Sequence, residues 1–354
     1  MSLFENKVVV ITGGTGSLGK VLTRRLLSKE VGCPRKIIIF SRDEAKQHFM
    51  RLAYQQKKKV TDEVIYHNFE QLLEFRIGDV RNYPAVCAVL QEADIVINAA
   101  ALKQVPSCEY FPYEAVQTNI AGAENIVRAI RDNNLKTETV VGISTDKACK
   151  PVNVMGMTKA IQERIFIAAN LTASKTRFIC VRYGNVLASR GSVIPMFHNQ
   201  INSGGPVTVT TAEMTRFLLS LESAVDTIFA AISRADSGDT FVPRVPAARI
   251  VDVAKALIGK RKIYIVYTGV RPGEKVHEIL VSDEEAHRTF ECGEYYVIEP
   301  MLPELVKLRT GSKALLKEYS SEDILMTPEE TRKLLKRHNL MDGQEIREDG
   351  EFLR

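Results

Sequence analysis

Short apolar runs alternate with segments of helical periodicity through the first half of the chain. The runs are rich in Val and Ile, which is typical of strands buried on both faces of a parallel sheet. We expect strands at residues 7–11, 36–40, 73–77, 94–101, 138–143 and 176–181. Helical patterns separate them, among them 20–27, 114–133 and 156–171. This alternation predicts an α/β fold, a Rossmann doubly wound parallel sheet.

The pattern changes after about residue 186. Short extended pieces such as 206–211 mix there with helical patterns at 221–234 and 250–257, which favours a smaller α/β lobe. The predicted organisation is a Rossmann domain at 1–186, a return to its sheet at about 217–242, a mainly substrate-binding lobe at 187–340, and a loose polar tail at 341–354.

Composition and charge narrow the class of protein. The 354 residues are 45% hydrophobic and 26% charged, with a net charge of +5, which excludes a disordered or collagen-like chain and gives no reason to expect a nucleic-acid partner. No apolar run reaches the roughly 18–20 residues that a transmembrane helix needs, and the first residues lack the features of a signal peptide. We therefore expect a cytoplasmic protein. The six Cys and six His form neither a CxxC pair nor an HExxH motif, so no metal site is expected.

A glycine-rich loop joins the first strand to the first helix. Gly13, Gly16 and Gly19 have the spacing GxxGxxG. Such a loop lets a pyrophosphate rest on bare backbone N–H groups at a helix start, so the sequence predicts a dinucleotide site. The loop residues assigned to the cofactor are Gly13, Thr15, Gly16, Ser17, Leu18 and Gly19.

The end of the second strand bears on the choice of cofactor. Ser41 and Arg42 offer a hydroxyl and a guanidinium suited to a ribose 2′-phosphate, which favours NADP. Asp43 follows directly and keeps NAD as the alternative, because a carboxylate there can accept a hydrogen bond from the ribose hydroxyl. Asp79 and Val80, at the end of the third strand, are expected to meet the adenine.

Several further motifs stand out along the chain. They are AAALKQVP at 99–106, STDKA at 144–148, PVNVMGMTK at 151–159, RYGNV at 182–186 and RPGEK at 271–275. Together they resemble the motifs of the extended short-chain dehydrogenase/reductases, and most closely the UDP-N-acetylglucosamine (UDP-GlcNAc) 4,6-dehydratases of bacterial surface-sugar pathways. The resemblance spans residues 7 to about 300. It implies a lyase that recycles its own NADP and takes UDP-GlcNAc as its substrate.

One position departs from the resembled superfamily, which carries Tyr-x-x-x-Lys. Here the pair is Met155 and Lys159, and a thioether has no titratable proton, so Met155 cannot be a general base. The resemblance includes a branch of active dehydratases with Met at this position. In that branch the proton of the sugar 4-hydroxyl must leave through another group, for which Thr145 and Asp146 are the nearest candidates.

The reaction implied by the resemblance is a 4,6-dehydration. Hydride leaves C4 of the sugar, water is eliminated across C5 and C6, and hydride returns to C6 to give a UDP-4-keto-6-deoxy-HexNAc. We assign Lys147 as the base at C5 and Asp146 as the acid at O6, as in the resembled family. These roles call for a lowered pKa of Lys147 and a raised pKa of Asp146 through burial. Retention at C5 is favoured by the motif at 153–156, while residues 101–109 resemble inverting relatives.

The resemblance also implies contacts for both ligands. Those to the cofactor are Ala99, Ala100, Ala101, Lys103, Asn119, Lys159, Tyr183 and Asn185. Those to the nucleotide sugar are Lys103, Asn185, Arg190, Ser192, Val193, Thr208, Thr210, Arg216, Arg271 and Glu274. Arg271 lies before a Pro-Gly turn and suits bidentate contact with a phosphate.

Two other functions stay open. A UDP-HexNAc 4-epimerase needs hydride transfer at C4 but no acid–base pair at C5 and C6, so Asp146 and Lys147 argue against it. A catalytically silent NADP-binding sensor is suggested only by the missing Tyr. We also expect a homo-oligomer, because this fold commonly pairs through sheet-flanking helices, for which 114–133 and 156–171 are candidates.

Overall fold

A large, mostly parallel sheet forms the centre of the computed structural model, which describes residues 2–56, 63–187, 192–307 and 313–341. Within these residues nine strands join in the order β14-β15-β10-β6-β5-β4-β1-β2-β3. They are β1 (Val8–Thr12), β2 (Lys36–Ser41), β3 (Leu73–Ile77), β4 (Ile95–Asn98), β5 (Thr139–Thr145), β6 (Arg177–Tyr183), β10 (Thr240–Pro243), β14 (Thr289–Cys292) and β15 (Tyr295–Ile298). All neighbours from β10 to β3 pair in parallel, whereas β15 pairs antiparallel with β10 and β14. The predicted doubly wound fold is confirmed.

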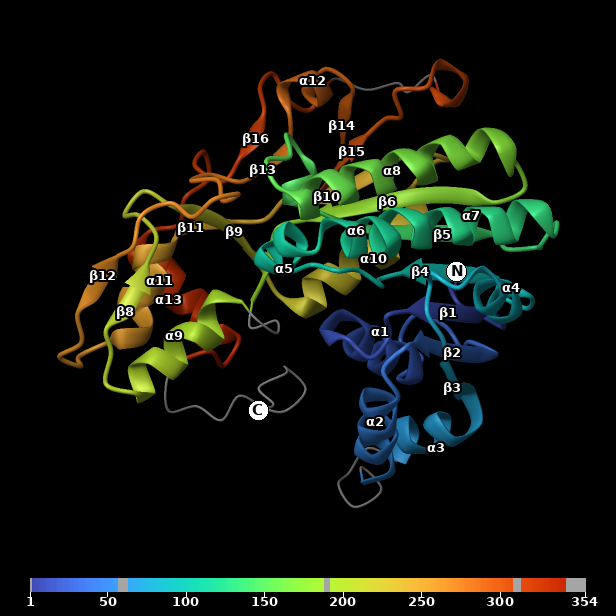
Figure 1. The fold of residues 1–354 in the computed structure, drawn as a ribbon, viewed down its shortest axis with the longest axis horizontal. Coiled ribbons are helices and arrows are strands. Elements are labelled where there is room, and N and C mark those ends of the chain that lie inside the picture. The colour runs from blue at the N-terminus through green and yellow to red at the C-terminus, as the bar shows by residue number, and fades with distance from the viewer. Residues whose placement is uncertain (1, 57–62, 188–191, 308–312, 342–354) are drawn as a thin grey trace.

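Helices cover both faces of this sheet (Figure 1). The helices of the first half are α1 (Ser17–Leu27), α2 (Glu44–Gln56), α3 (Glu63–Leu72), α4 (Tyr83–Leu90), α5 (Val105–Tyr110), α6 (Pro112–Ala115), α7 (Gly122–Asp132) and α8 (Val154–Thr172). Alternate residues of each strand point to opposite faces. Val9 and Ile11 therefore pack in one core with α1 and α10 (Leu221–Arg234), while Val8 and Val10 pack in a second core with α4, α7 and α8.

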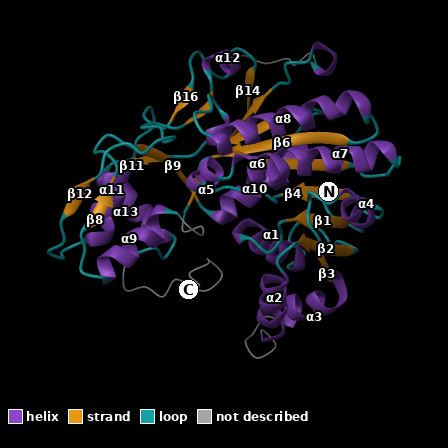
Figure 2. Cartoon of the chain, viewed as in Figure 1, coloured by secondary structure: helices purple, strands orange, loops and turns teal. Residues whose placement is uncertain are grey.

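The second half of the chain divides between the main sheet and a smaller lobe (Figure 2). The chain returns to the sheet at β10, which pairs with β6, and β14 and β15 then extend it. A separate sheet contains β7 (Asn185–Val186), β9 (Thr215–Leu219) and β11 (Ala247–Arg249). The remaining elements are α9 (Val193–Asn202), β8 (Val207–Val209), α11 (Ile250–Ile258), β12 (Ile265–Tyr267), β13 (Ile279–Val281), α12 (Asp283–Ala286), β16 (Tyr319–Ser320) and α13 (Pro328–Arg337).

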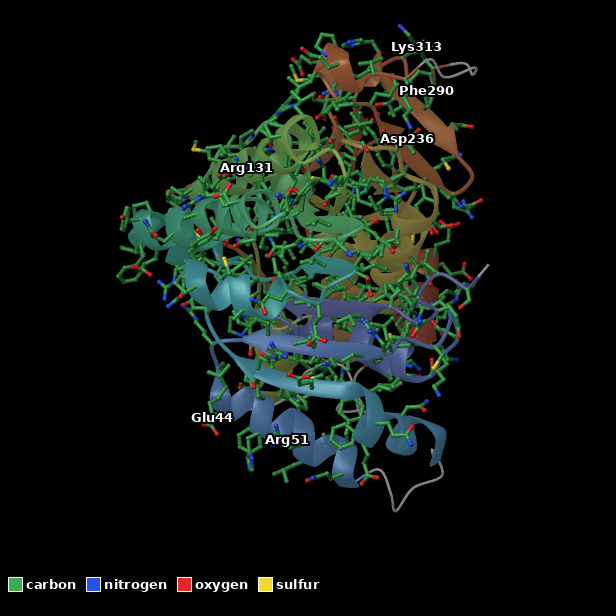
Figure 3. The ribbon with its side chains drawn as sticks, turned by 90° about the vertical axis from the view of Figure 1, so that its right-hand side faces the viewer. Glu44, Arg51, Arg131, Asp236, Phe290 and Lys313 are labelled. Atoms are coloured by element: carbon green, nitrogen blue, oxygen red, sulfur yellow. The ribbon has the colours of Figure 1, made fainter. Side chains whose placement is uncertain are left out.

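The two edges of the nine-stranded sheet lie toward opposite ends of the molecule (Figure 3). Glu44 and Arg51 on α2 lie at one end, and Phe290 and Lys313, which form an isolated bridge, lie at the other. Within the described residues, no helix has both the length and the hydrophobicity needed to cross a bilayer. Most of the predicted polar tail, 342–354, lies outside the described residues.

Candidate active site

The glycine loop lies where the strand order reverses, between β1 and β4. Gly13 has φ +66°, and a Cβ there would stand 2.8 Å from the backbone of Ala100. A Cβ on Gly19 would stand 2.3 Å from the carbonyl oxygen of Gly14, so α1 packs directly on the turn. Gly16, which precedes α1, supplies no side-chain cap to the first N–H groups of the helix. This close-packed, uncapped helix start fits the pyrophosphate of a dinucleotide.

The end of β2 carries one exposed cation beside two engaged side chains. The Ser41 hydroxyl accepts hydrogen bonds from Gln47 Nε2 at 3.1 Å and from the Thr15 hydroxyl at 3.3 Å. The Asp43 carboxylate accepts from the Lys46 N–H at 3.0 Å and pairs with Lys46 Nζ at 2.7 Å. The Arg42 guanidinium remains exposed.

The end of β3 is held by charge pairs. Asp79 pairs with Arg81 Nη2 at 2.7 Å and lies 3.7 Å from Arg42 Nη1. Although burial opposes it, the hydrogen bonds from Arg81 keep the pKa of Asp79 below its ordinary value. Val80 is buried, and its carbonyl accepts from Asn125 Nδ2 at 2.9 Å.

Asn119 links the loop after β4 to α8. It is fully buried in a π-helical turn, Val116–Ala121. Its Oδ1 accepts from the Leu102 N–H at 2.8 Å, and its Nδ2 donates to the Leu102 carbonyl and to Thr158 Oγ1, both at 3.0 Å. Asn119 therefore fixes the segment that contains the half-buried Ala99, Ala100 and Ala101, whereas the nearby Lys103 is exposed.

Met155 and Lys159 occupy the first half of α8. Met155 packs with Cys108 and Ala115 in a small apolar cluster. Lys159 is buried and donates to Gln162 Oε1 at 2.9 Å, and burial lowers the pKa of Lys159 to about 8. The amine therefore has a polar partner without a formal charge, and Met155 offers no proton-transfer group beside it.

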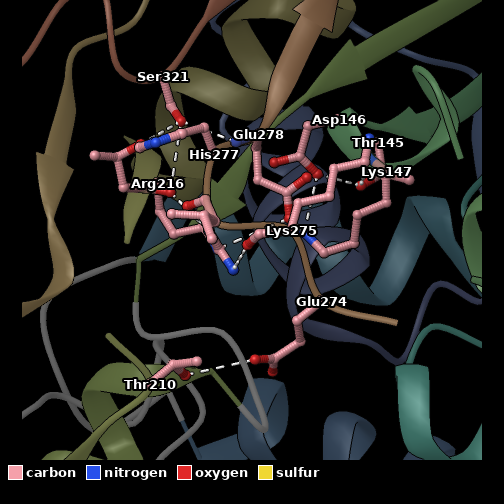
Figure 4. Close-up of polar contacts among 12 residues, drawn as sticks. Thr145, Asp146, Lys147, Thr210, Arg216, Glu274, Lys275, His277, Glu278 and Ser321 are labelled. Atoms are coloured by element: carbon pink, nitrogen blue, oxygen red, sulfur yellow. Dashed lines mark hydrogen bonds and ion pairs between the residues drawn. The ribbon is translucent and has the colours of Figure 1, made fainter. Parts of the chain in front are cut away.

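A charged cluster follows the end of β5 on a 3-10 turn, Asp146–Ala148 (Figure 4). The Thr145 hydroxyl donates to Asp146 Oδ1 at 2.8 Å. Lys147 Nζ lies 3.1 Å from Asp146 Oδ1 and 3.0 Å from Glu278 Oε1. Asp146 is fully buried, and its Oδ2 has no hydrogen-bond partner in the described part of the chain.

The charge state of Lys147 differs from the expectation. Burial alone would lower the pKa of Lys147, but the carboxylates of Asp146 and Glu278 outweigh it and raise this pKa above its ordinary value. The predicted lowering was wrong for this state, because burial brings two carboxylates to the amine together with the loss of water.

Glu278 was missed by the sequence reasoning. It is 1% exposed, its backbone N–H donates to Ser321 Oγ at 3.0 Å, and its Oε2 has no hydrogen-bond partner among the described residues. A signal was present, since Glu278 stands immediately before the apolar run 279–281 that forms β13. Nothing in that run indicates that the carboxylate meets Lys147.

The guanidinium of Arg216, which we expected at the sugar nucleotide, instead donates hydrogen bonds to backbone carbonyls of the protein. It is buried in β9, and its Nη1 donates to the Val276 carbonyl and its Nη2 to the Lys275 carbonyl, each at 3.0 Å. Its Nε lies 3.8 Å from Glu278 Oε1. Arg216 therefore positions the 275–278 segment beside Lys147.

The other residues expected at the sugar nucleotide fall into two groups. Thr208 and Thr210 are engaged, since Thr208 Oγ1 accepts from Gln200 Nε2 at 2.7 Å and Thr210 donates to Glu274 at 3.5 Å. Arg271 is exposed, and its guanidinium makes no hydrogen bond or ion pair with the described residues.

Unpaired polar atoms mark the entry to the smaller lobe. Asn185 Oδ1 and Ser192 Oγ are buried without a hydrogen-bond partner among the described residues. Ser192 occupies the N-cap position of α9, whose first residue is Val193, but its hydroxyl makes no capping hydrogen bond. Tyr183 lies beside Thr145 in the register of β5 and β6, and burial raises its pKa. Arg190 lies outside the described residues.

A cavity of about 760 Å³ lies next to the Asp146–Ala148 turn. Its lining includes Ala148 and Pro151, and also Arg182, which pairs with Glu163 and Glu285 at 2.7 Å each. Neither Asp146 nor Lys147 lines it, so we separate this cavity from the candidate active site.

Known proteins share both the sequence and the fold. The family described as "Polysaccharide biosynthesis protein" matches residues 9–300. A UDP-glucose 4-epimerase of Rickettsia akari (strain Hartford) is 44% identical over 345 residues, which cover 94% of this chain and 96% of the relative. Pen from Bacillus thuringiensis superposes with a TM-score of 0.85 at 33% identity, over 96% of this chain and 99% of Pen.

More distant structures share the fold alone. DesIV from Streptomyces venezuelae, a dTDP-glucose 4,6-dehydratase solved with NAD, has a TM-score of 0.63 at 17% identity over 76% of this chain and 86% of DesIV. The family match and the conserved architecture lead to one conclusion: the chain belongs to the polysaccharide biosynthesis protein family of extended short-chain dehydrogenase/reductases, a family of nucleotide-sugar dehydratases and epimerases.

Proposed function

We propose that this chain is a UDP-GlcNAc 4,6-dehydratase, a lyase that forms a UDP-4-keto-6-deoxy-HexNAc. The observation that carries the proposal is the ion pair between Asp146 Oδ1 and Lys147 Nζ at 3.1 Å. Dehydration needs an acid at O6 and a base at C5 within a few ångströms of each other, and epimerisation at C4 needs neither. The Lys147 side chain is 21% exposed, so it is not sealed within the protein.

The two residues have separate tasks. When bound, the nicotinamide cofactor supplies the oxidation at C4 and the matching reduction at C6. Thr145 takes the proton of the 4-hydroxyl and passes its own to Asp146, to which it already donates at 2.8 Å. Asp146 gives that proton to the departing O6, so the C6–O bond breaks and water leaves. Neutral Lys147 removes the C5 proton while the C5–C6 double bond forms, and it later returns a proton to C5, with retention at C5 favoured by the resemblance.

Met155 suits this division of labour. Its thioether has no titratable proton and packs among apolar side chains, so the proposed proton pathway runs through Thr145 instead. Lys159 then serves as a neighbouring amine that contacts the cofactor ribose, as the resemblance implies.

The cofactor is proposed to be NADP. The residues that would hold it are the Gly13–Gly19 loop, Arg42 at the ribose phosphate, and Val80 at the adenine. Asp43 supports this preference because its carboxylate is engaged at the start of α2. A calorimetric titration of the cofactor-free protein with NADP and with NAD tests it, and tighter binding of NAD would reverse the assignment.

The substrate is proposed to enter beside the smaller lobe. The exposed Arg271, which has no partner among the described residues, suits the diphosphate. Asn185 Oδ1 and Ser192 Oγ, also without partners in that part of the chain, could bind the rest of the nucleotide sugar. The choice of the N-acetyl sugar rests on the resemblance.

A 4-epimerase is the second candidate, favoured by the names of the relatives at 44% identity. Such an enzyme needs one group that takes and returns the 4-hydroxyl proton. Thr145 with Asp146 can do so, but the Lys147 amine would then have no task at C5.

The variants Asp146→Asn and Lys147→Ala test the proposal. We expect each to lower the dehydration rate by about 10²–10⁴-fold while cofactor binding persists, because each removes one proton-transfer group. The measurement follows the 4-keto product from UDP-GlcNAc, with cofactor binding as the control for folding. Full activity in both variants would remove the basis for the assignment.

A further inference from the structure

We propose that Glu278 is a positioning residue that sets the protonation of Lys147 and thereby the pH at which the site becomes active. The inference deepens the proposed function, on which its kinetic part rests. Glu278 reaches the Lys147 amine from a distant segment of the chain, and its Oε1 lies 3.0 Å from Nζ.

The surroundings of Glu278 place its carboxylate between two cationic side chains. It is 1% exposed, and the only cations within 4 Å in the described part of the chain are Lys147 and Arg216, the latter at 3.8 Å. A buried carboxylate needs such partners, because an unpaired charge in the interior is costly. The backbone N–H of Glu278 donates to Ser321 Oγ at 3.0 Å, which anchors the main chain from which the carboxylate extends.

Four charged groups face Lys147 in the described part of the chain. Asp146 lies on its own turn, Glu278 precedes β13, Arg216 comes from β9, and Lys275 adds a second amine whose Nζ donates to the Cys149 carbonyl at 2.6 Å. The two carboxylates favour the ammonium form of Lys147, and the two cations oppose it. Asp146 must gain and lose a proton during turnover, so Glu278 is the permanent counter-ion.

This arrangement has a kinetic consequence. Lys147 must lose its proton before it can act at C5, and Glu278 opposes that loss. The same carboxylate strengthens the base, because it stabilises the ammonium that forms as the C5 proton moves. Glu278 thus places the acidic limb of the pH–rate profile at higher pH and raises the rate above that limb.

Glu278→Gln tests this role, since the amide keeps the shape and removes the charge. We expect the acidic limb of kcat to move down by about 1–3 pH units, as for loss of an opposite charge at this distance, and the plateau rate to fall. KM should change little. Glu278→Asp keeps a carboxylate and should restore the limb towards its original position. An unchanged limb in Glu278→Gln would overturn the inference.

A second measurement is independent of the substrate. Acetylation of Lys147 by acetic anhydride, followed across pH by peptide mass spectrometry, reports its pKa directly because only the neutral amine reacts. Glu278→Gln should shift the midpoint down by about 1–3 units. The matched control is Glu318→Gln, which removes the carboxylate 2.6 Å from the nearby Lys150 and should move the Lys150 midpoint only.

The two measurements separate two failures. A shifted Lys147 midpoint in a protein that makes no dehydration product would refute the proposed function and leave the role of Glu278 in setting the charge of Lys147 intact. An unshifted midpoint in an active, folded Glu278→Gln enzyme would refute the role of Glu278 and leave the dehydratase in place.

Discussion

Lys147 and Lys159, both assigned to the proposed active site, have opposite electrostatic surroundings. Lys159 is buried with Gln162 as its hydrogen-bond partner, and burial lowers its pKa to about 8. Lys147 meets two carboxylates, which raise its pKa despite burial. The Lys159 amine can therefore lose its proton near neutral pH, whereas the two carboxylates favour the ammonium form of Lys147.

The lowered pKa of Lys159 predicts a pH-dependent stability. Between pH 8 and about 10.4 the unfolded chain holds a proton on this lysine that the native protein has lost, so the free energy of unfolding rises with pH. The rise contributed by Lys159 approaches about 1.4 kcal/mol per pH unit. Urea unfolding of the cofactor-free wild type and of Lys159→Met at pH 7.5 and 9.5 measures it. The difference in unfolding free energy, wild type minus variant, should increase with pH; a constant difference would contradict the lowered pKa.

Sequence reasoning succeeded for residues that are neighbours in the chain. Thr145, Asp146 and Lys147 are consecutive, so the end of one strand brings them together. Glu278 and Arg216 reach the same amine from segments that only the tertiary fold joins, and no local pattern indicates that meeting. Because the contact with Glu278 was not foreseen, the pKa of Lys147 was predicted to shift in the wrong direction.

At the scale of elements, apolar periodicity located the strands of the Rossmann half but not their polar ends. β5 continues through Ser144 and Thr145, beyond the apolar run that ends at Ile143, because backbone pairing with β6 persists where the side chains turn polar. The helix expected at 114–133 contains the π-helical turn Val116–Ala121. A pattern with a period of 3.6 residues does not reveal the wider π-helical turn, although this turn contains Asn119.

The contact between α8 and the Asp146–Ala148 turn predicts that Gly156 cannot be replaced without loss of stability. A Cβ on Gly156 would stand 2.2 Å from the Lys147 carbonyl oxygen, so Gly156→Ala must push the turn away from the helix. We expect a loss of about 1–3 kcal/mol in unfolding free energy and a slower dehydration. Urea unfolding and the rate of product formation measure the two effects. In a helix without this contact, Gly to Ala stabilises by about 1 kcal/mol, so a stabilised, fully active variant would contradict the packing.

At the scale of the whole molecule, the predicted boundary between two domains is crossed by the main sheet. β10, β14 and β15 come from the second half of the chain and enlarge the sheet of the first. In the sequence, a short strand that joins the main sheet looks the same as a short strand of the smaller lobe. The difference lies in the pairing partner, which is distant in the chain. The overall fold was thus predictable from the long periodic runs. A return to the main sheet was expected at about 217–242, which includes part of β10, but the addition of β14 and β15 was not expected.

The outer face of α8 supports the proposed homo-oligomer. Met157, Ile161 and Leu171 are 47%, 47% and 45% exposed, and they share one side of the helix. A row of this kind is a candidate contact between copies. Ile161→Asp should reduce the mass measured by light scattering to that of one chain, because it places a charge in the contact. Leu316→Asp, at a fully exposed leucine elsewhere, is the control and should keep the wild-type mass. An unchanged mass in Ile161→Asp would exclude this face.

The central claim, dehydration of UDP-GlcNAc, is tested most directly by proton NMR of that sugar nucleotide incubated with the wild-type protein and NADP in D₂O. We expect a new methyl signal from C6 of a 4-keto-6-deoxy sugar, with a C5 configuration that shows retention. Conversion to UDP-GalNAc without a methyl signal would contradict the account and establish an epimerase. An unchanged spectrum from protein that binds NADP would contradict it in favour of a silent sensor.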